Sequence, residues 1–174
     1  MGVLGPDPTA ADLAAVHRQL GRAPRGVDSV AYRCPCGEPA VLATRPRLPD
    51  GTPFPTLYYL TCARAASAIG TLEAQGAMNA MNARLAADPA LAAAHRAAHT
   101  DYLTHRHRVA DVAEIAGVSA GGMPDRVKCL HVLAGHALAA GPGVNPLGDE
   151  VVAELGEWWR THPCATREQT EDTP

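Results

Sequence analysis

A chain of 174 residues with 47% hydrophobic content is long enough to bury one core and most simply forms a single domain. Its formal net charge of −3 and its pI near 6.2 argue against general nucleic-acid binding, which needs a basic surface to displace counterions. The sequence has no run of 18 apolar residues and no signal-peptide pattern, so it predicts a cytoplasmic protein that does not span a membrane.

The two ends of the chain are expected to lie outside the core. We expect residues 1–8 to form a flexible arm, residues 9–162 a single globular domain and residues 163–174 a disordered tail. Because the tail is polar, we do not expect Cys164 to bind a metal ion.

The first predicted helix follows this arm. Thr9, with Asp12 three positions later, has the pattern of a helix start, and apolar residues recur on one face as far as Leu20. Gly21 would end this helix, which we interpret as an ordinary packing helix.

Extended structure is predicted between residues 26 and 62. Residues 27–34 alternate, residues 40–44 would form a return strand, and residues 56–62 are rich in β-branched and aromatic side chains. The prolines and glycine of residues 48–55 are typical of a chain reversal. These three strands predict an antiparallel meander.

The order of the strands in this meander brings cysteines together. The first strand would end at Cys34 and the third at Cys62, and in an up–down–up arrangement both ends lie at the same edge of the sheet. Cys36 follows Cys34 in the turn. We therefore expect the three thiols to converge.

Helices are predicted for most of the remaining chain. Residues 63–87 form one predicted helix, in which Gly70 and Gly76 are weak points, and Asp88 with Pro89 would start the next. This next helix carries a group of histidines that we expect to form an exposed polar face, or at most a weak metal site: His95, His99, His105 and His107.

A glycine-rich segment interrupts the helices. Gly121 and Gly122 break the chain before Pro124, which predicts the start of a further helix. The free N–H groups of that helix start, beside Arg126 and Lys128, would favour an anion. The sequence thus predicts an anion-binding site; the alternative is that the glycines permit a tight entry and the cations pair with nearby carboxylates.

The last predicted helix follows a second turn-rich segment. The Pro124 helix would run to about Ala140, and residues 141–149 contain several glycines and prolines. Asn145 would cap the final helix, which is predicted to reach Arg160.

Four thiols form the candidate metal site. Four thiolates in a tetrahedron suit zinc, and four cysteines also suit an iron–sulfur cluster. A cysteine at a helix start is favoured as a thiolate by the positive end of the helix dipole. His131 and His136 are alternative fourth ligands. The predicted metal ligands are Cys34, Cys36, Cys62 and Cys129.

Three functions are compatible with these features. The first is a small protein with a structural metal ion, whose anion site receives a phosphorylated ligand or a protein partner. The second is a metal-dependent enzyme that acts on a phosphorylated small molecule held by Arg126 and Lys128. The third is a metal-free protein-interaction module with buried, unliganded thiols. Redox or nucleophilic use of the thiols is a further alternative.

The predicted fold class is α+β, a small three-stranded antiparallel meander packed against four or five helices.

Four stretches of the chain are similar to an uncharacterised bacterial family. They are RCPCGEPAVL at 33–42, LPDGTPFPTLYYLTC at 48–62, SAGGMPDRVKCLH at 119–131 and GPGVNPLGD at 141–149. On these motifs the chain resembles the family catalogued as domain of unknown function number 501. It departs from the family at Ala63, where a proline is common. The resemblance implies a cytosolic bacterial protein, often encoded near a glycolytic enolase, a septum-formation initiator-like protein and an exopolyphosphatase-like protein, and it implies no established activity.

Overall fold

A computed structural model describes residues 2–160 and Cys164. Within them the elements are α1 (Ala10–Leu20), β1 (Val27–Arg33), β2 (Pro39–Thr44), β3 (Tyr58–Leu60), α2 (Ala63–Ala74), α3 (Ala77–Ala87), α4 (Pro89–Val109), the 3₁₀-helix η1 (Ala113–Ile115), α5 (Leu130–Ala140) and α6 (Pro146–Leu155). The predicted α+β class is confirmed. No helix in this part of the chain is long and apolar enough to cross a membrane.

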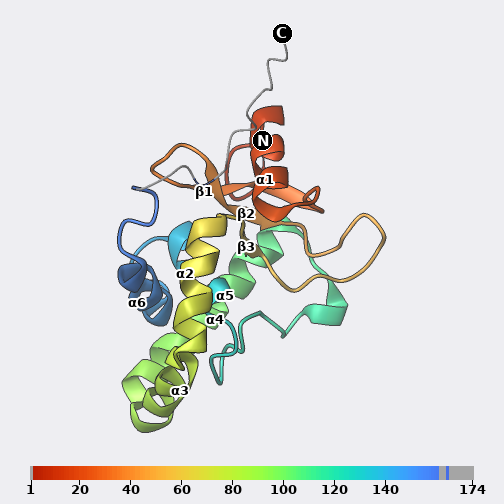
Figure 1. Cartoon of the computed structure of the whole chain (residues 1–174). Coiled ribbons are helices and arrows are strands. Elements are labelled where there is room, and N and C mark those ends of the chain that lie inside the picture. Colours follow the sequence, from red (N-terminus) through yellow and green to blue (C-terminus); the bar gives the residue numbers. More distant parts are fainter. Residues whose placement is uncertain (1, 161–163, 165–174) are drawn as a thin grey trace.

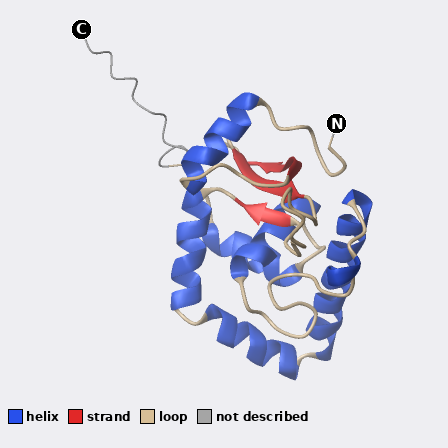
Figure 2. Ribbon diagram, turned by 90° about the vertical axis from the view of Figure 1, so that its right-hand side faces the viewer, coloured by secondary structure: helices blue, strands red, loops and turns tan. Residues whose placement is uncertain are grey.

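The three strands form the predicted antiparallel meander in the order β1-β2-β3. Helices cover both faces of this small sheet, with α1 on one side and α5 on the other (Figures 1 and 2). On the α1 face, Val16 packs with Val30 and Leu42, whereas Val41 and Ala43 point into the larger core on the α5 face. Alternate residues of β2 therefore serve two cores, and the whole strand is buried.

The free edge of β1 is covered by the segment that precedes α1. The N–H group of Val30 donates to the carbonyl oxygen of Pro6, and the N–H group of Val3 donates to a carboxylate oxygen of Asp28, both at 3.0 Å. An edge strand paired in this way has fewer open hydrogen-bonding groups. The arm predicted for residues 1–8 thus contacts the sheet, while the tail predicted for residues 163–174 lies outside the described residues apart from Cys164.

The described chain has six α-helices, where four or five were predicted. The difference arises because the predicted helix over residues 63–87 is divided into two. Gly76 adopts a φ of 88° and separates α2 from α3. That left-handed conformation is open to glycine at little cost and ends a right-handed helix.

The prediction that Pro124 begins a helix is wrong. Residues 121–125 form consecutive turns, and α5 begins at Leu130 with Cys129 as its N-cap. The N–H group of Lys128 donates to the carbonyl oxygen of Gly121, at 2.7 Å, and so closes a loop instead of a helical turn. A proline fits the first turn of a helix but does not create one when the following amides bond back into a loop.

The prediction of an exposed histidine face on α4 is also wrong. His95 is 1% exposed and its Nε2 atom lies 3.3 Å from the carbonyl oxygen of Arg126. His99 is half-buried, with Nδ1 2.9 Å from the hydroxyl of Ser119. Each ring faces a separate group of the loop that precedes α5, so the two do not share a metal site; His107 is exposed.

The last helix begins as predicted and ends early. The side-chain oxygen of Asn145 accepts a hydrogen bond from the N–H group of Gly148, at 3.0 Å, which caps α6. The helix ends at Leu155 and not at Arg160, because Gly156 follows it with a φ of 56°.

A buried cation holds two long loops against α4. Arg106 is 1% exposed, and its guanidinium donates hydrogen bonds to the carbonyl oxygens of Pro55, Ile115 and Val118. Burial lowers the pKa of Arg106, but a guanidinium stays charged at any pH at which proteins fold. The planar donors of this one side chain therefore hydrogen bond to backbone carbonyl groups of two loops, the one before β3 and the one after α4.

We expect Arg106→Lys to lower the free energy of unfolding by about 2–4 kcal/mol, because a lysine lacks the planar set of donors and leaves buried carbonyl groups unpaired. Urea unfolding followed by circular dichroism measures this difference. Arg108→Lys, at an exposed position on the same helix, is the matched control and should have almost no effect. Equal stabilities for the two variants would contradict this role of Arg106.

The centre of the main core contains a fully buried histidine, His136. Its Nε2 atom lies 2.9 Å from Asp101 Oδ1, and its Nδ1 atom lies 3.3 Å from Asn145 Nδ2. Since the Asn145 oxygen caps α6, the amide nitrogen donates to Nδ1, and the proton of the neutral ring is on Nε2. The ring also stacks on Tyr58 and meets Tyr102 edge-on, so His136 joins β3, α4, α5 and α6.

We expect three histidines, His136, His95 and His99, to lower the free energy of unfolding as the pH falls below about 6.5. Burial lowers the pKa of His136, and it also lowers the pKa of His95 and His99. A histidine with a folded pKa below its unfolded value binds a proton more readily when unfolded. Its stabilising contribution is therefore complete above the unfolded pKa and decreases as the pH falls through the folded one.

Urea unfolding between about pH 8 and pH 5 tests this expectation. His136→Gln should reduce the dependence on pH, whereas His107→Ala, at an exposed position, should leave it unchanged. Because the raised pKa of His131 acts in the opposite direction, the decisive quantity is the difference between the wild type and His136→Gln. A difference that does not change between about pH 8 and pH 5 would show that His136 is not held neutral.

Candidate metal centre

The turn between β1 and β2 carries two cysteines. The N–H group of Cys34 donates to the carbonyl oxygen of Glu38, and the N–H group of Gly37 donates to that of Cys34, each at 2.8 Å. Gly37 has a φ of 94°, which allows the tight reversal. The turn leaves the Cys34 thiol buried and the Cys36 thiol exposed at the rim.

The third cysteine lies at the junction between β3 and α2. Cys62 is fully buried, is the N-cap of α2, and its N–H group faces the carbonyl oxygen of Ala40 on β2, at 3.4 Å. Because β1 and β3 both pair antiparallel with β2, their ends at Cys34 and Cys62 lie at the same sheet edge. The predicted common edge is thus observed.

Cys164 is the thiol that brings the group together. Its Sγ atom lies 3.2 Å from that of Cys34, and it also interacts with the thiols of Cys36 and Cys62. The sulfur atoms of Cys34, Cys36 and Cys164 all lie within 4.8 Å of one another, close enough to hold a metal ion. The polar sequence around Cys164 gave no sign of this position, which is why Cys164 was left out of the predicted ligands.

The environment of Cys34 and Cys164 opposes negative charge. Burial raises the pKa of Cys34 to about 11 and raises that of Cys164 further. Burial also acts to raise the pKa of Cys36, but backbone hydrogen bonds at Glu38 and Cys164 outweigh it and lower this pKa. A bound divalent cation reverses the effect of burial, because it stabilises the thiolate form of each ligand.

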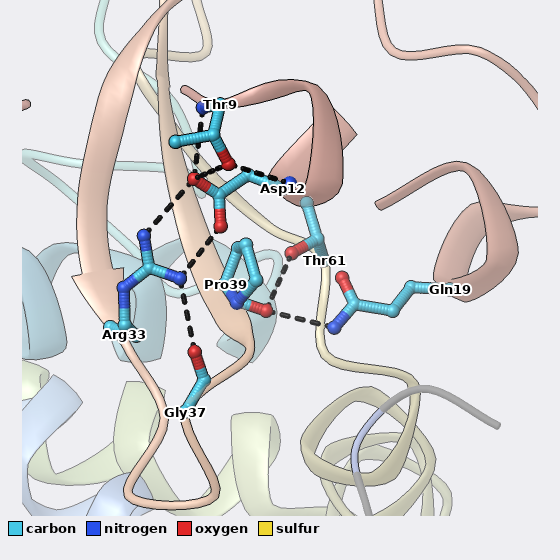
Figure 3. A network of polar contacts seen from close by, with 7 residues as sticks. All are labelled: Thr9, Asp12, Gln19, Arg33, Gly37, Pro39 and Thr61. Carbon is cyan, nitrogen blue, oxygen red and sulfur yellow. Dashed lines mark hydrogen bonds and ion pairs between the residues drawn. The ribbon is translucent and has the colours of Figure 1, made fainter. Parts of the chain in front are cut away.

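A polar network fixes the cysteine turn to α1 (Figure 3). Thr9 and Asp12 form the predicted capping box at the start of α1. Arg33 donates to Asp12 Oδ1, at 2.7 Å, and to the carbonyl oxygen of Gly37, at 3.0 Å. The hydrogen bond from Arg33 is the largest cause that lowers the pKa of Asp12 to about 2. Arg33 directly precedes Cys34, and Gly37 directly follows Cys36. The side chain of Arg33 therefore holds both ends of the cysteine turn against Asp12 of α1.

A second part of the network holds the neighbouring strand end. The carbonyl oxygen of Pro39, where β2 begins, accepts hydrogen bonds from the side chains of Gln19, at 2.8 Å, and Thr61, at 3.5 Å (Figure 3). Thr61 directly precedes Cys62 in the chain. The network thus contacts residues adjacent to all three cysteines at this end of the sheet, which are Cys34, Cys36 and Cys62.

We expect Asp12→Asn to lower the free energy of unfolding by about 1–2 kcal/mol, because it removes the charge that pairs with the partly exposed Arg33. A carboxylate with a folded pKa below its unfolded value stabilises the fold above about pH 4, and this contribution disappears as the pH falls toward 2. The difference between the wild type and Asp12→Asn should therefore shrink below about pH 4 in urea unfolding. A difference independent of pH would mean that the ion pair contributes nothing.

Cys129 lies in a different place from the other predicted ligands. Its Sγ atom is 3.8 Å from Nδ1 of His131, which is 3.3 Å from Oε1 of Glu73. Hydrogen bonding to His131 is the main cause that lowers the pKa of Cys129, and the same contact raises the pKa of His131 to about 9. A pocket of about 260 Å³ lies beside Cys129 and His131, with Tyr59 and Val132 among its other walls.

The third group of possible ligands is a hydrogen-bonding network. Asp101, His105 and His136 have donor atoms within 4.8 Å of one another. The Nε2 atom of His136 carries the proton directed at Asp101, and Nδ1 of His105 lies 2.9 Å from the hydroxyl of Tyr58. Both ring nitrogens of His136 and the Nδ1 atom of His105 are used in these contacts. His136, a predicted alternative ligand of the cysteine site, therefore belongs to the core.

The predicted anion site lies on the loop before α5. Arg126 and Lys128 are exposed, and the N–H groups of both bond to the carbonyl oxygens of Gly122 and Gly121. These amides are not directed at a ligand, since the loop itself uses them. The anion site and its phosphorylated ligand stay predictions.

The fold and the cysteine cluster together define a class: an α+β protein with a group of thiols that could hold a metal ion. The chain belongs to the family described as protein of unknown function (DUF501), whose model matches residues 30–153. Cys164 lies beyond the matched segment. Neither the curated proteins nor the solved structures contain a significant match to this chain.

Proposed function

We propose that the protein binds a structural zinc ion through Cys34, Cys36, Cys62 and Cys164. The observation that supports this proposal is the position of Cys164, 3.2 Å from Cys34 and within 4.8 Å of Cys36. Cys62 lies outside this group of three but interacts with Cys164. Four cysteines from three separate segments can complete a closed tetrahedral site, which is the usual form of structural zinc. This replaces Cys129, the predicted fourth ligand, with Cys164.

A single metal ion fits these thiols better than a disulfide bond does. Sulfur atoms on two corners of a zinc tetrahedron are about 3.8 Å apart, and those of a disulfide are about 2.05 Å apart. The separation of 3.2 Å between Cys34 and Cys164 is nearer to the first value. A disulfide would also use only two of the four thiols.

A single ion also fits better than an iron–sulfur cluster. Several irons and sulfides separate the cysteine ligands of such a cluster, whereas three of the sulfurs here lie within 4.8 Å of one another. Because four thiolates leave no open position on zinc, the proposed role is structural and not catalytic.

The proposed zinc ion would stabilise a part of the fold that has little core of its own. The sheet has three strands, and β3 is three residues long. A sheet of this size depends on packing against other elements. Zinc binding would tie the chain at Cys164 to the cysteine turn and to the start of α2, and its free energy would contribute directly to folding. The cytoplasmic location, where thiols stay reduced, remains part of this proposal.

The exposed Cys36 offers the sharpest test. If the thiols only pack, Cys36→Ser should change the free energy of unfolding by less than about 0.5 kcal/mol, as at other exposed positions. If Cys36 is a zinc ligand, the variant should lose one zinc equivalent and about 3 kcal/mol of stability. Cys164→Ser should lose the same equivalent.

Elemental analysis of protein purified without oxygen, combined with urea unfolding, measures both quantities. A chelator should destabilise the wild type more than either variant. Metal contents equal to that of the wild type in both folded variants would refute the proposed site, and so would a wild-type protein that contains iron and sulfide instead of zinc.

A further inference from the structure

We propose that Glu73, Cys129 and His131 bind a second zinc ion, which has an open coordination position facing a pocket. This site is separate from the cysteine cluster and does not depend on it. The three donor atoms all lie within 4.8 Å of one another. They come from the last turn of α2, from the N-cap of α5 and from its first turn.

The separations between the donor atoms match those around a single ion. Tetrahedral zinc with a thiolate, an imidazole and a carboxylate has sulfur–nitrogen and nitrogen–oxygen separations of about 3.6 and 3.4 Å. Here Cys129 Sγ lies 3.8 Å and Glu73 Oε1 lies 3.3 Å from Nδ1 of His131. These two separations would each change by a few tenths of an ångström, and Cys129 Sγ lies within 4.8 Å of a carboxylate oxygen of Glu73.

The orientation of His131 directs Nδ1 at the proposed metal position. Its Nε2 atom lies 3.1 Å from the carbonyl oxygen of Ala66, and a carbonyl only accepts, so Nε2 carries a proton. Nδ1 then points between Cys129 and Glu73, and a metal ion there would replace the proton that these two neighbours hold on Nδ1 in the metal-free protein. A metal-binding histidine is typically held in this way, by a backbone carbonyl on its second nitrogen.

The three donor atoms are directed at one another, while the Ala66 carbonyl group orients the ring through its other nitrogen. At this site Glu73 and Cys129 share Nδ1, and only one proton can lie between them. Three donors that converge on one point are the arrangement of a coordination site.

Charge and rigidity also favour a divalent cation. One thiolate, one carboxylate and a neutral imidazole carry two negative charges, which zinc neutralises. Glu73 is held by the N–H group of Leu130, which donates to Oε1 at 2.7 Å. This bond fixes the carboxylate against the first turn of α5, so the site is organised before the metal binds.

The open side distinguishes this site from the cysteine cluster. Cys129 and His131 line a pocket of about 260 Å³, whose other walls include Tyr59, Leu60 and Val132. Zinc with three protein ligands keeps its fourth position for water or for a ligand. A small molecule that coordinates through one anionic atom fits this position.

Zinc binding to the full-length chain tests the proposal. After equilibration with zinc and dialysis, Cys129→Ser should contain one equivalent less than the wild type. Glu73→Gln should bind the second ion at least about tenfold more weakly, a loss that even changes outside the ligand shell can cause. Since glutamine keeps the acceptor for the Leu130 N–H group, this variant preserves the start of α5. His107→Ala, an exposed histidine, is the control for adventitious binding.

The outcomes separate the two zinc sites. Loss of one equivalent in Cys129→Ser but not in His107→Ala supports this site, whether or not Cys36→Ser also loses one. Equal zinc contents in the wild type and in both folded Cys129→Ser and Glu73→Gln overturn it and leave the cysteine cluster unaffected.

The open position has its own readout. In protein substituted with Co²⁺, azide should change the visible absorption of the wild type and of Cys36→Ser, but not that of Cys129→Ser. A wild-type spectrum that does not respond to azide would show that the second ion has no exchangeable position and would overturn this part of the proposal.

Discussion

β2 is hydrogen bonded to an antiparallel neighbour on each side and covered by helices on both faces, and the positions of both proposed sites follow from this. Antiparallel pairing brings the ends of β1 and β3 to the start of β2, which places Cys34 beside Cys62. The face opposite α1 receives α5, whose contacts with β3 bring Cys129 and His131 against the strand. One buried strand thus sets the distance between the cysteine cluster and the site formed by Glu73, Cys129 and His131, which is called the mixed site below.

The two sites have complementary chemistry. The cysteine cluster is largely buried and uses a single ligand type, and its neighbours are held by hydrogen bonds that leave the sulfurs little freedom. The mixed site combines sulfur, nitrogen and oxygen donors at a helix start and opens to a pocket. In zinc proteins the first arrangement typically stabilises a fold and the second typically binds a water or a ligand. The protein would in this way combine a stabilising ion with a reactive one.

The sequence predicted features that depend on local rules or on strand order. The capping box at Thr9 is a contact between residues three positions apart, and the common edge of Cys34 and Cys62 follows from up–down–up connectivity. The start of α5 depended on a loop whose amides bond among themselves, and the burial of His95 depended on the same loop lying across α4. Cys164 is 130 positions from Cys34, although their sulfur atoms lie 3.2 Å apart, so no local pattern could indicate this contact. Contacts between distant segments decided the burial of His95 and the position of Cys164, whereas hydrogen bonds within one loop decided the start of α5.

Arg106 makes the two longest loops of the described chain mechanically dependent on each other. Its donors satisfy carbonyl groups of both loops, and among the described residues it has no carboxylate partner that could stabilise the charge alone. If either loop moves away, the guanidinium loses part of its solvation and the other loop becomes less stable. The loops should therefore open as one cooperative unit. Residues of this unit reach the pocket at Thr56, so access to the mixed site is coupled to the carbonyl groups of Ile115 and Val118 in the loop after α4.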